Sequence, residues 1–109
     1  MTHGLIDVAR IAAEELERAR ANPHGRSARA LTHDGRLRHT LLAILDGESL
    51  GEHAKPESAT LHVLSGSLVV SSGEEETRLE AGQLAVLPGP SHDVTAVGDA
   101  VAILTTLAG

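Results

Sequence analysis

The sequence contains no cysteine, no phenylalanine, no tyrosine and no tryptophan. The missing cysteines exclude disulfide bonds, thiolate metal sites and cysteine nucleophiles. Without aromatic rings, the core must be built from Leu, Val, Ile and Ala, each of which buries less area than a ring. A ligand would also find no aromatic surface to stack on. Because such a core is modest, burial against a second copy would help, and we expect a homodimer.

Basic residues are also few, with nine Lys and Arg against fifteen Asp and Glu and a formal charge of -6. A surface of this sign repels phosphate backbones and anionic lipids, so we expect neither nucleic acid nor a membrane as a partner. No apolar run approaches the roughly 20 residues of a membrane span. The opening MTHGLIDVAR lacks the basic and apolar segments of a secretion signal, and we expect a cytoplasmic protein.

The chain length of 109 residues fits one domain with one hydrophobic core. Residues 1–25 predict an α-helix that packs on the outside of a barrel, its own or a neighbour's. Thr2 is a suitable N-cap, and Asn22-Pro23 ends the pattern. The apolar positions recur at three- and four-residue spacing, as on one face of a helix: Leu5, Ala9, Ala12, Leu16 and Ala19.

From Arg26 onward, short extended segments alternate with turn dipeptides. Asp34-Gly35 is a strong hairpin signal, and further breaks are predicted at Ser65-Gly66 and Val97-Gly98. About eight strands result, with no room for helical crossovers between them. Residues 26–109 are therefore predicted to form an all-β, antiparallel, jelly-roll-like barrel. We expect the homodimer to form through sheet edges or through the N-terminal helix.

The stretch GESLGEHAKPESATLHVLSG, from Gly47 to Gly66, resembles the first motif of the cupins. That motif is Gly, five residues, His-x-His, three or four residues, Glu, six residues, Gly. His53 falls on the first His of the motif. Lys55 falls on the second His and Ala59 on the Glu. The glycines and the spacing are kept, whereas two of the three ligands are replaced.

A second cupin motif, Gly, five residues, Pro-x-Gly, two residues, His, is similar to GQLAVLPGPSHDV. Its His corresponds to His92 if one residue is deleted and to Asp93 if none is. We place it at His92, because the alternation of His92, Val94 and Ala96 gives one strand face an apolar stripe. Asp93 is then expected to point outward.

The resemblance implies a cupin barrel with a depleted metal site, to which the chain adds the N-terminal α-helix predicted from its apolar spacing. Of the motif ligands, only His53 and His92 remain. Binding of a divalent transition metal (zinc, iron, manganese or nickel) would need a third ligand, for which the candidates are His39, His62 and Glu57. His62 has the opposite parity to the lost Glu position and is expected to face away from it. The direction of His39 is left open.

Lys55 has two interpretations. If it points inward, its ammonium group needs an anion or a lowered pKa; otherwise HAKPES is a polar loop and Lys55 faces water. We predict a small-molecule-binding protein, either a binding module or a metal-independent enzyme, that holds a small anionic ligand near His53, Lys55 and His92. The alternative is a metal-dependent enzyme similar to cupin dioxygenases or isomerases, using His53 and His92 with a third ligand. A scaffold without a ligand is a third interpretation, and the sequence identifies no catalytic residue.

Overall fold

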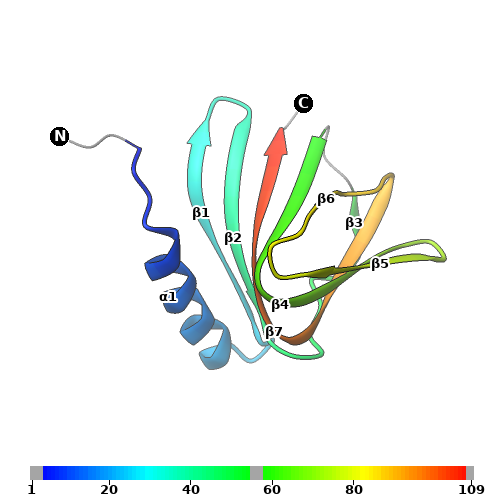
Figure 1. Ribbon diagram of the computed structural model, residues 1–109, viewed down its shortest axis with the longest axis horizontal. Coiled ribbons are helices and arrows are strands. Elements are labelled where there is room, and N and C mark those ends of the chain that lie inside the picture. Colours follow the sequence, from blue (N-terminus) through cyan, green and yellow to red (C-terminus); the bar gives the residue numbers. More distant parts are fainter. Residues whose placement is uncertain (1–3, 55–57, 108–109) are drawn as a thin grey trace.

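The computed structural model describes residues 4–54 and 58–107, apart from the side chain of His53. One helix and seven strands lie within these residues, and every strand pairing is antiparallel. The prediction of an all-β barrel with an N-terminal helix is confirmed (Figure 1). The elements are α1 (Val8–Ala21), β1 (Arg26–Asp34), β2 (Leu37–Ile44), β3 (His53–Ala54), β4 (Ser58–Ser72), β5 (Glu75–Glu80), β6 (Leu84–Val86) and β7 (Ser91–Leu107).

The strands follow the order β1-β2-β7-β4-β5, with β3 added beside β7 and β6 beside β4. β4 and β7 pair over two stretches, with shifts in register between Val63 and Ser67. Figure 1 shows both strands turning at the same end of the barrel, so that their two halves lie in different layers. The breaks predicted at Ser65-Gly66 and Val97-Gly98 are therefore bends inside continuous strands.

The bend in β4 requires a glycine at position 66. Its φ is +74°, and a Cβ built on it would lie 2.2 Å from the carbonyl oxygen of Asp99 and 2.8 Å from Cα of Ala100. Only a residue without a side chain allows β4 and β7 to approach so closely. This contact closes one end of the barrel, and the opposite end is its mouth.

The inner core fills the space between the two layers with aliphatic side chains from β2, β4, β5 and β7 and from Leu87, between β6 and β7. Alternate residues of β4 point into it, because successive strand residues face opposite sides. The buried members of this cluster are Leu42, Ile44, Ala59, Leu61, Val63, Leu68, Val70, Leu79, Leu87, Val94, Ala96, Ala100 and Ala102.

The helix α1 packs on the outside of β1 and β2. It begins at Val8, because the Asp7 side chain accepts a hydrogen bond of 3.2 Å from the backbone of Arg10 and so acts as the N-cap. Leu5, placed in the helix by its spacing, instead precedes it and is 75% exposed. Thr2 lies outside the described residues. Within the described part of the chain, no helix is long and apolar enough to span a membrane.

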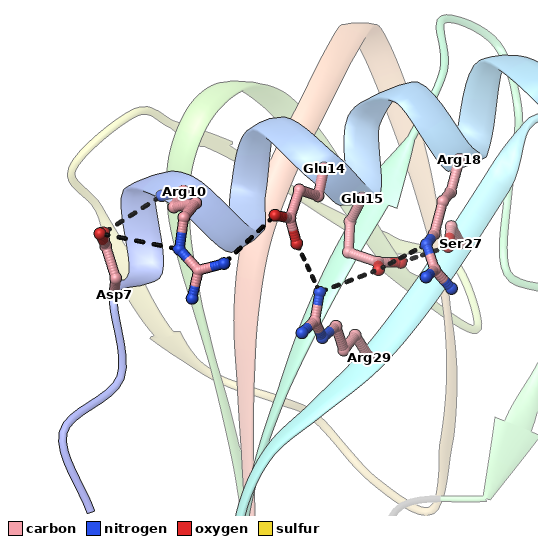
Figure 2. A network of polar contacts seen from close by, with 7 residues as sticks. All are labelled: Asp7, Arg10, Glu14, Glu15, Arg18, Ser27 and Arg29. Carbon is pink, nitrogen blue, oxygen red and sulfur yellow. Dashed lines mark hydrogen bonds and ion pairs between the residues drawn. The ribbon is translucent and has the colours of Figure 1, made fainter.

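A buried carboxylate lies between α1 and the sheet (Figure 2). Glu15 is fully buried and accepts a hydrogen bond from the Ser27 hydroxyl. Its other oxygen, Oε1, has no hydrogen-bond partner among the described residues and lies 3.5 Å from Nε of Arg18. Beside it, Arg29 donates a 2.7 Å hydrogen bond to Glu14, which lowers the pKa of that carboxyl below its usual value. The polar residues of α1 therefore fix the helix to β1.

Candidate functional site

The segment before β3 is held along the N-terminal half of β7 by backbone hydrogen bonds. Gly47 donates to the carbonyl of Ala96 at 2.9 Å, and Leu50 donates to the carbonyl of Val94 at 3.0 Å. The ladder continues into β3, where His53 pairs with His92 and Ala54 with Ser91. The fold thus brings the backbones of the two predicted motif histidines, 39 positions apart in the sequence, directly opposite each other.

His92 points into the barrel and is only 1% exposed. It shares the buried side of β7 with Val94 and Ala96, as the alternation predicts. Its Nδ1 lies 3.0 Å from the carbonyl oxygen of Pro88. A carbonyl only accepts hydrogen bonds, so Nδ1 carries a proton, and in the neutral ring Nε2 has the lone pair. The protein therefore fixes both the orientation and the tautomer of this ring.

The side chain of the neighbouring Asp93 binds backbone amides. Its Oδ1 accepts hydrogen bonds from the amides of Gly51, at 3.0 Å, and of Val94, at 2.7 Å. The first of these bonds ties the segment before β3 to β7. Of the two candidates for the second motif, His92 is therefore the one whose side chain points inward, whereas Asp93 stabilises the loop.

Ala59, at the position of the motif Glu, lies close to His92 at the mouth of the barrel. Leu87 donates a 2.9 Å hydrogen bond to the carbonyl of Ala59, and the next residue, Pro88, accepts the bond from His92. Ala59 is 3% exposed and points inward. The structure therefore joins the two cupin motifs at this end, with a methyl group where the family motif carries a carboxylate.

A row of cross-strand pairs continues from Ala59 along the inner side of the mouth. Ala59 pairs with Thr106, and Thr106 pairs with Arg38. Arg38 has the same parity in β2 as Leu42 and Ile44, which belong to the inner core. Its side chain is exposed, and its guanidinium forms no hydrogen bond or ion pair with any described residue. A guanidinium group without a described partner thus lies on the inner side of the mouth.

A shallow depression of about 180 Å³ opens beside Ala59. It lies between the ends of three strands and is lined by Leu37 from β2, residues 58–60 from β4 and residues 105–107 from β7. Its volume is below the roughly 300 Å³ at which pockets for drug-sized ligands begin. The depression therefore suits a molecule of a few heavy atoms.

His39 and His62 do not join His92. His39 shares its side of β2 with Leu41 and Ala43, which pack under α1, and its Nδ1 lies 2.7 Å from the Thr32 hydroxyl. His62 lies between inward-pointing residues of β4, so it faces outward, as its parity predicts. The described residues contain no group of three or more His, Asp and Glu side chains able to hold a metal ion. They do not fit a three-ligand metal centre.

Three predicted site residues are not fully described. Lys55 and Glu57 lie outside the described residues, and His53 is described only in its backbone. Their predicted roles as ligands, and that of His92, stay predictions. Arg38 and Thr106 were not identified from the sequence. The alternation along β2, after the hairpin at Asp34-Gly35, indicates which of its residues share a face. Which residue Arg38 meets depends on the pairing of β2 with the far end of the chain, where it lies beside Thr106.

Comparison with known proteins identifies the family. The Cupin domain family model matches residues 40–107, which is more than half of the chain. This chain belongs to the cupin family, as its two motifs predict. No curated protein matches it.

Solved structures share the fold over most of their length. TT1209 from Thermus thermophilus is 26% identical, with a TM-score of 0.76, and the match covers 97% of this chain and 99% of that one. A conserved protein of unknown function from Streptococcus pyogenes is also 26% identical, with a TM-score of 0.72 and coverage of 81% and 78%. A cupin-2 domain protein from Shewanella frigidimarina is 17% identical, with a TM-score of 0.71 and coverage of 95% of both chains.

Proposed function

We propose that this cupin binds a small anionic molecule at the mouth of its barrel without a tightly held metal ion. The observation that carries the proposal is the row from Ala59 through Thr106 to Arg38, whose guanidinium has no partner among the described residues. It offers a hydroxyl and a guanidinium on the side where the family motif carries a carboxylate. A guanidinium matches the geometry of a carboxylate or phosphate, since it presents several donors in one plane.

His92 supports the same proposal. Its Nδ1 is committed to Pro88, so the ring cannot rotate without breaking that bond. The imidazole is thereby held on the inner side of the mouth, where the family motif carries a ligand. Lys55, two positions after His53, would add a second cation if it points inward. The proposed ligand is non-aromatic, because the chain contains no aromatic ring on which it could stack.

The experiment uses tag-free protein, so that added histidines do not bind metal. Elemental analysis measures the metal content, and calorimetric titration with inorganic phosphate and with succinate measures anion binding. We expect substoichiometric metal and binding of at least one anion. Arg38→Gln removes a charged hydrogen bond of about 1.5–3 kcal/mol, so affinity should fall by about 10- to 100-fold. Arg78→Gln, an exposed arginine on β5, is the matched control and should bind normally.

A second substitution tests the imidazole separately. His92→Asn places an amide nitrogen where Nδ1 was, so the bond to Pro88 is kept while Nε2 is lost. We expect weaker anion binding with little change in the thermal midpoint. His39→Asn, on the outer side of the sheet, is the control. Equal anion affinity in Arg38→Gln and Arg78→Gln, or no anion binding by the wild type at millimolar concentration, would refute the proposal.

The alternative function is a metal-dependent enzyme that uses His53 and His92. It is favoured by the direct pairing of these two backbone positions. Positions opposed in an antiparallel ladder belong to the same face of a sheet. His39 and His62 lie on the other side of the sheet. Of the three predicted third ligands, only Glu57 therefore remains a candidate. One tightly bound transition ion per chain, lost in His92→Asn and kept in His62→Asn, would support this alternative against the first proposal.

A further inference from the structure

The end of β1 at the mouth of the barrel contains a β-bulge. From Arg26 to Ala30 each residue of β1 pairs with one residue of β2, and the pairing resumes with Thr32 opposite His39. At this point β1 has one residue, Leu31, more than the strand beside it. Leu31 packs against the apolar cluster under α1, which holds the bulge in place. An extra residue in one strand changes the side that the following residues face.

The bulge turns His33 to the inner side of the sheet. Arg29 contacts α1 on the outer side, and plain alternation from Arg29 would place His33 on that side too. Instead, His33 pairs with Arg38 on the inner side. Thr32 takes the outer position, where its hydroxyl lies 2.7 Å from Nδ1 of His39. Bulges at barrel rims commonly redirect a side chain in this way beside a functional site.

His33 and Arg38 form a pair of hydrogen-bond donors that solvent can reach. Ala28, Ala30 and His33 are all exposed on the inner side of β1, so the second layer of the barrel does not cover this edge. Neither His33 nor Arg38 forms a side-chain hydrogen bond or ion pair with a described residue. Each of the other arginines in the described part of the chain has a polar or electrostatic partner. The carboxylate of Asp34, next to His33 in the strand, points to the opposite side.

We infer that His33 is a further donor of the anion site and that this site selects a phosphate group over a carboxylate. The inference rests on the proposed function and names the chemical class of its ligand. A carboxylate has two oxygens, which two parallel N–H groups of one guanidinium satisfy. A phosphate group presents a third oxygen, to which an imidazole N–H beside the guanidinium can donate. His33 therefore adds little to the binding of a carboxylate and one further hydrogen bond to the binding of a phosphate group.

The test compares anion affinities by calorimetric titration of tag-free protein with inorganic phosphate, methyl phosphate and acetate. We expect the wild type to bind both phosphates more tightly than acetate. His33→Ala should lower phosphate affinity by at least about 10-fold, since it removes a hydrogen bond to a charged group, and acetate affinity by less than about 2-fold. His33→Arg keeps a planar donor and should retain the preference. His24→Ala replaces an exposed histidine ahead of β1 and is the control, which should bind like the wild type.

A double variant tests the direction of the imidazole. Thr32→His with His33→Thr keeps the composition but moves the imidazole to the outer side, so it should bind phosphate as weakly as His33→Ala. Circular dichroism checks that each variant folds. Tighter binding of methyl phosphate than of inorganic phosphate assigns the ligand as a phosphate ester, and the reverse order assigns it as the free ion.

Two kinds of result separate this inference from the proposed function. Acetate binding as tight as phosphate binding in the wild type would overturn the inference, as would wild-type phosphate affinity in His33→Ala or in the double variant. The proposed function survives these results if Arg38→Gln weakens the binding of both phosphate and acetate. A wild type that binds no anion refutes the proposed function and this inference with it.

Discussion

Replacing Gly66 by alanine tests the contact that closes the barrel. Gly66 has a φ of +74°, and Gly47, the first glycine of the same motif, has a φ of +79°. Both substitutions place a Cβ in the left-handed region, which costs about 1–2 kcal/mol. They differ in the space available: nothing lies within 4 Å of a Cβ at Gly47, whereas one at Gly66 would lie 2.2 Å from the Asp99 oxygen.

That distance is far below the 3.0 Å that real Cβ contacts respect, and the obstructing atoms belong to the backbone of β7. The clash is relieved only if β4 and β7 separate at the bend, beside the pairs of Ser65 with Val101 and Ser67 with Val97. Loss of two ladder hydrogen bonds at about 1 kcal/mol each, added to the left-handed cost and to disturbed packing, totals about 4–5 kcal/mol. This is a large part of the roughly 5–15 kcal/mol that stabilises a typical domain.

Thermal unfolding followed by circular dichroism distinguishes the two variants. For a domain of this size, 1 kcal/mol corresponds to about 4–8 °C, so Gly47→Ala should lower Tm by roughly 5–15 °C. Gly66→Ala should lower it by at least about 20 °C or abolish the cooperative transition. If both variants melt within a few degrees of each other, the close approach of the strands does not contribute to stability, and the reasoning fails.

Two further substitutions test carboxylates outside the site. Glu15→Met should be neutral or stabilise the fold by about 1–2 kcal/mol in urea unfolding, because it removes a desolvated charge and keeps the volume. Glu15→Ala should destabilise the fold by about 2–4 kcal/mol, because it leaves a cavity under the helix. If Glu15→Met destabilises the fold, the ion pairs of Glu15 make a net favourable contribution and the expectation is wrong. The Ser67 hydroxyl, and then Arg78, lower the pKa of Glu80 below its usual 4.5. The ionised Glu80 therefore contributes its full stabilisation above pH 4.5, and this contribution is lost as pH falls through the lowered pKa. In Glu80→Gln, the urea midpoint should therefore fall less steeply on acidification than in the wild type. An equally steep fall in both proteins would contradict this.

The sequence predicted features that depend on local periodicity. Alternation along a strand is decided by neighbouring residues, so the inward direction of His92 and the outward direction of His62 follow from parity alone. The helix was predicted with the wrong start, since Leu5 fits the apolar spacing while the Asp7 side chain determines where the helix begins. The burial of Glu15 between α1 and the sheet was not predicted from the sequence.

Features that depend on contacts between distant segments were not accessible from the sequence. Ser65-Gly66 reads locally as a strand end, and only its contact with Asp99, 33 positions away, makes it a bend. Arg38 enters the proposed anion site only through its register with Thr106 at the other end of the chain.

By itself, then, the sequence determined the family, the antiparallel all-β class and the loss of two metal ligands. These features depend on motif spacing and strand alternation, which involve only residues close together in the chain. The tertiary structure decided which residues meet at the mouth. The physical reason is that cross-strand register and helix docking are set by the packing of the whole core. A residue such as Arg38 therefore gains its significance only from neighbours that are remote in the chain.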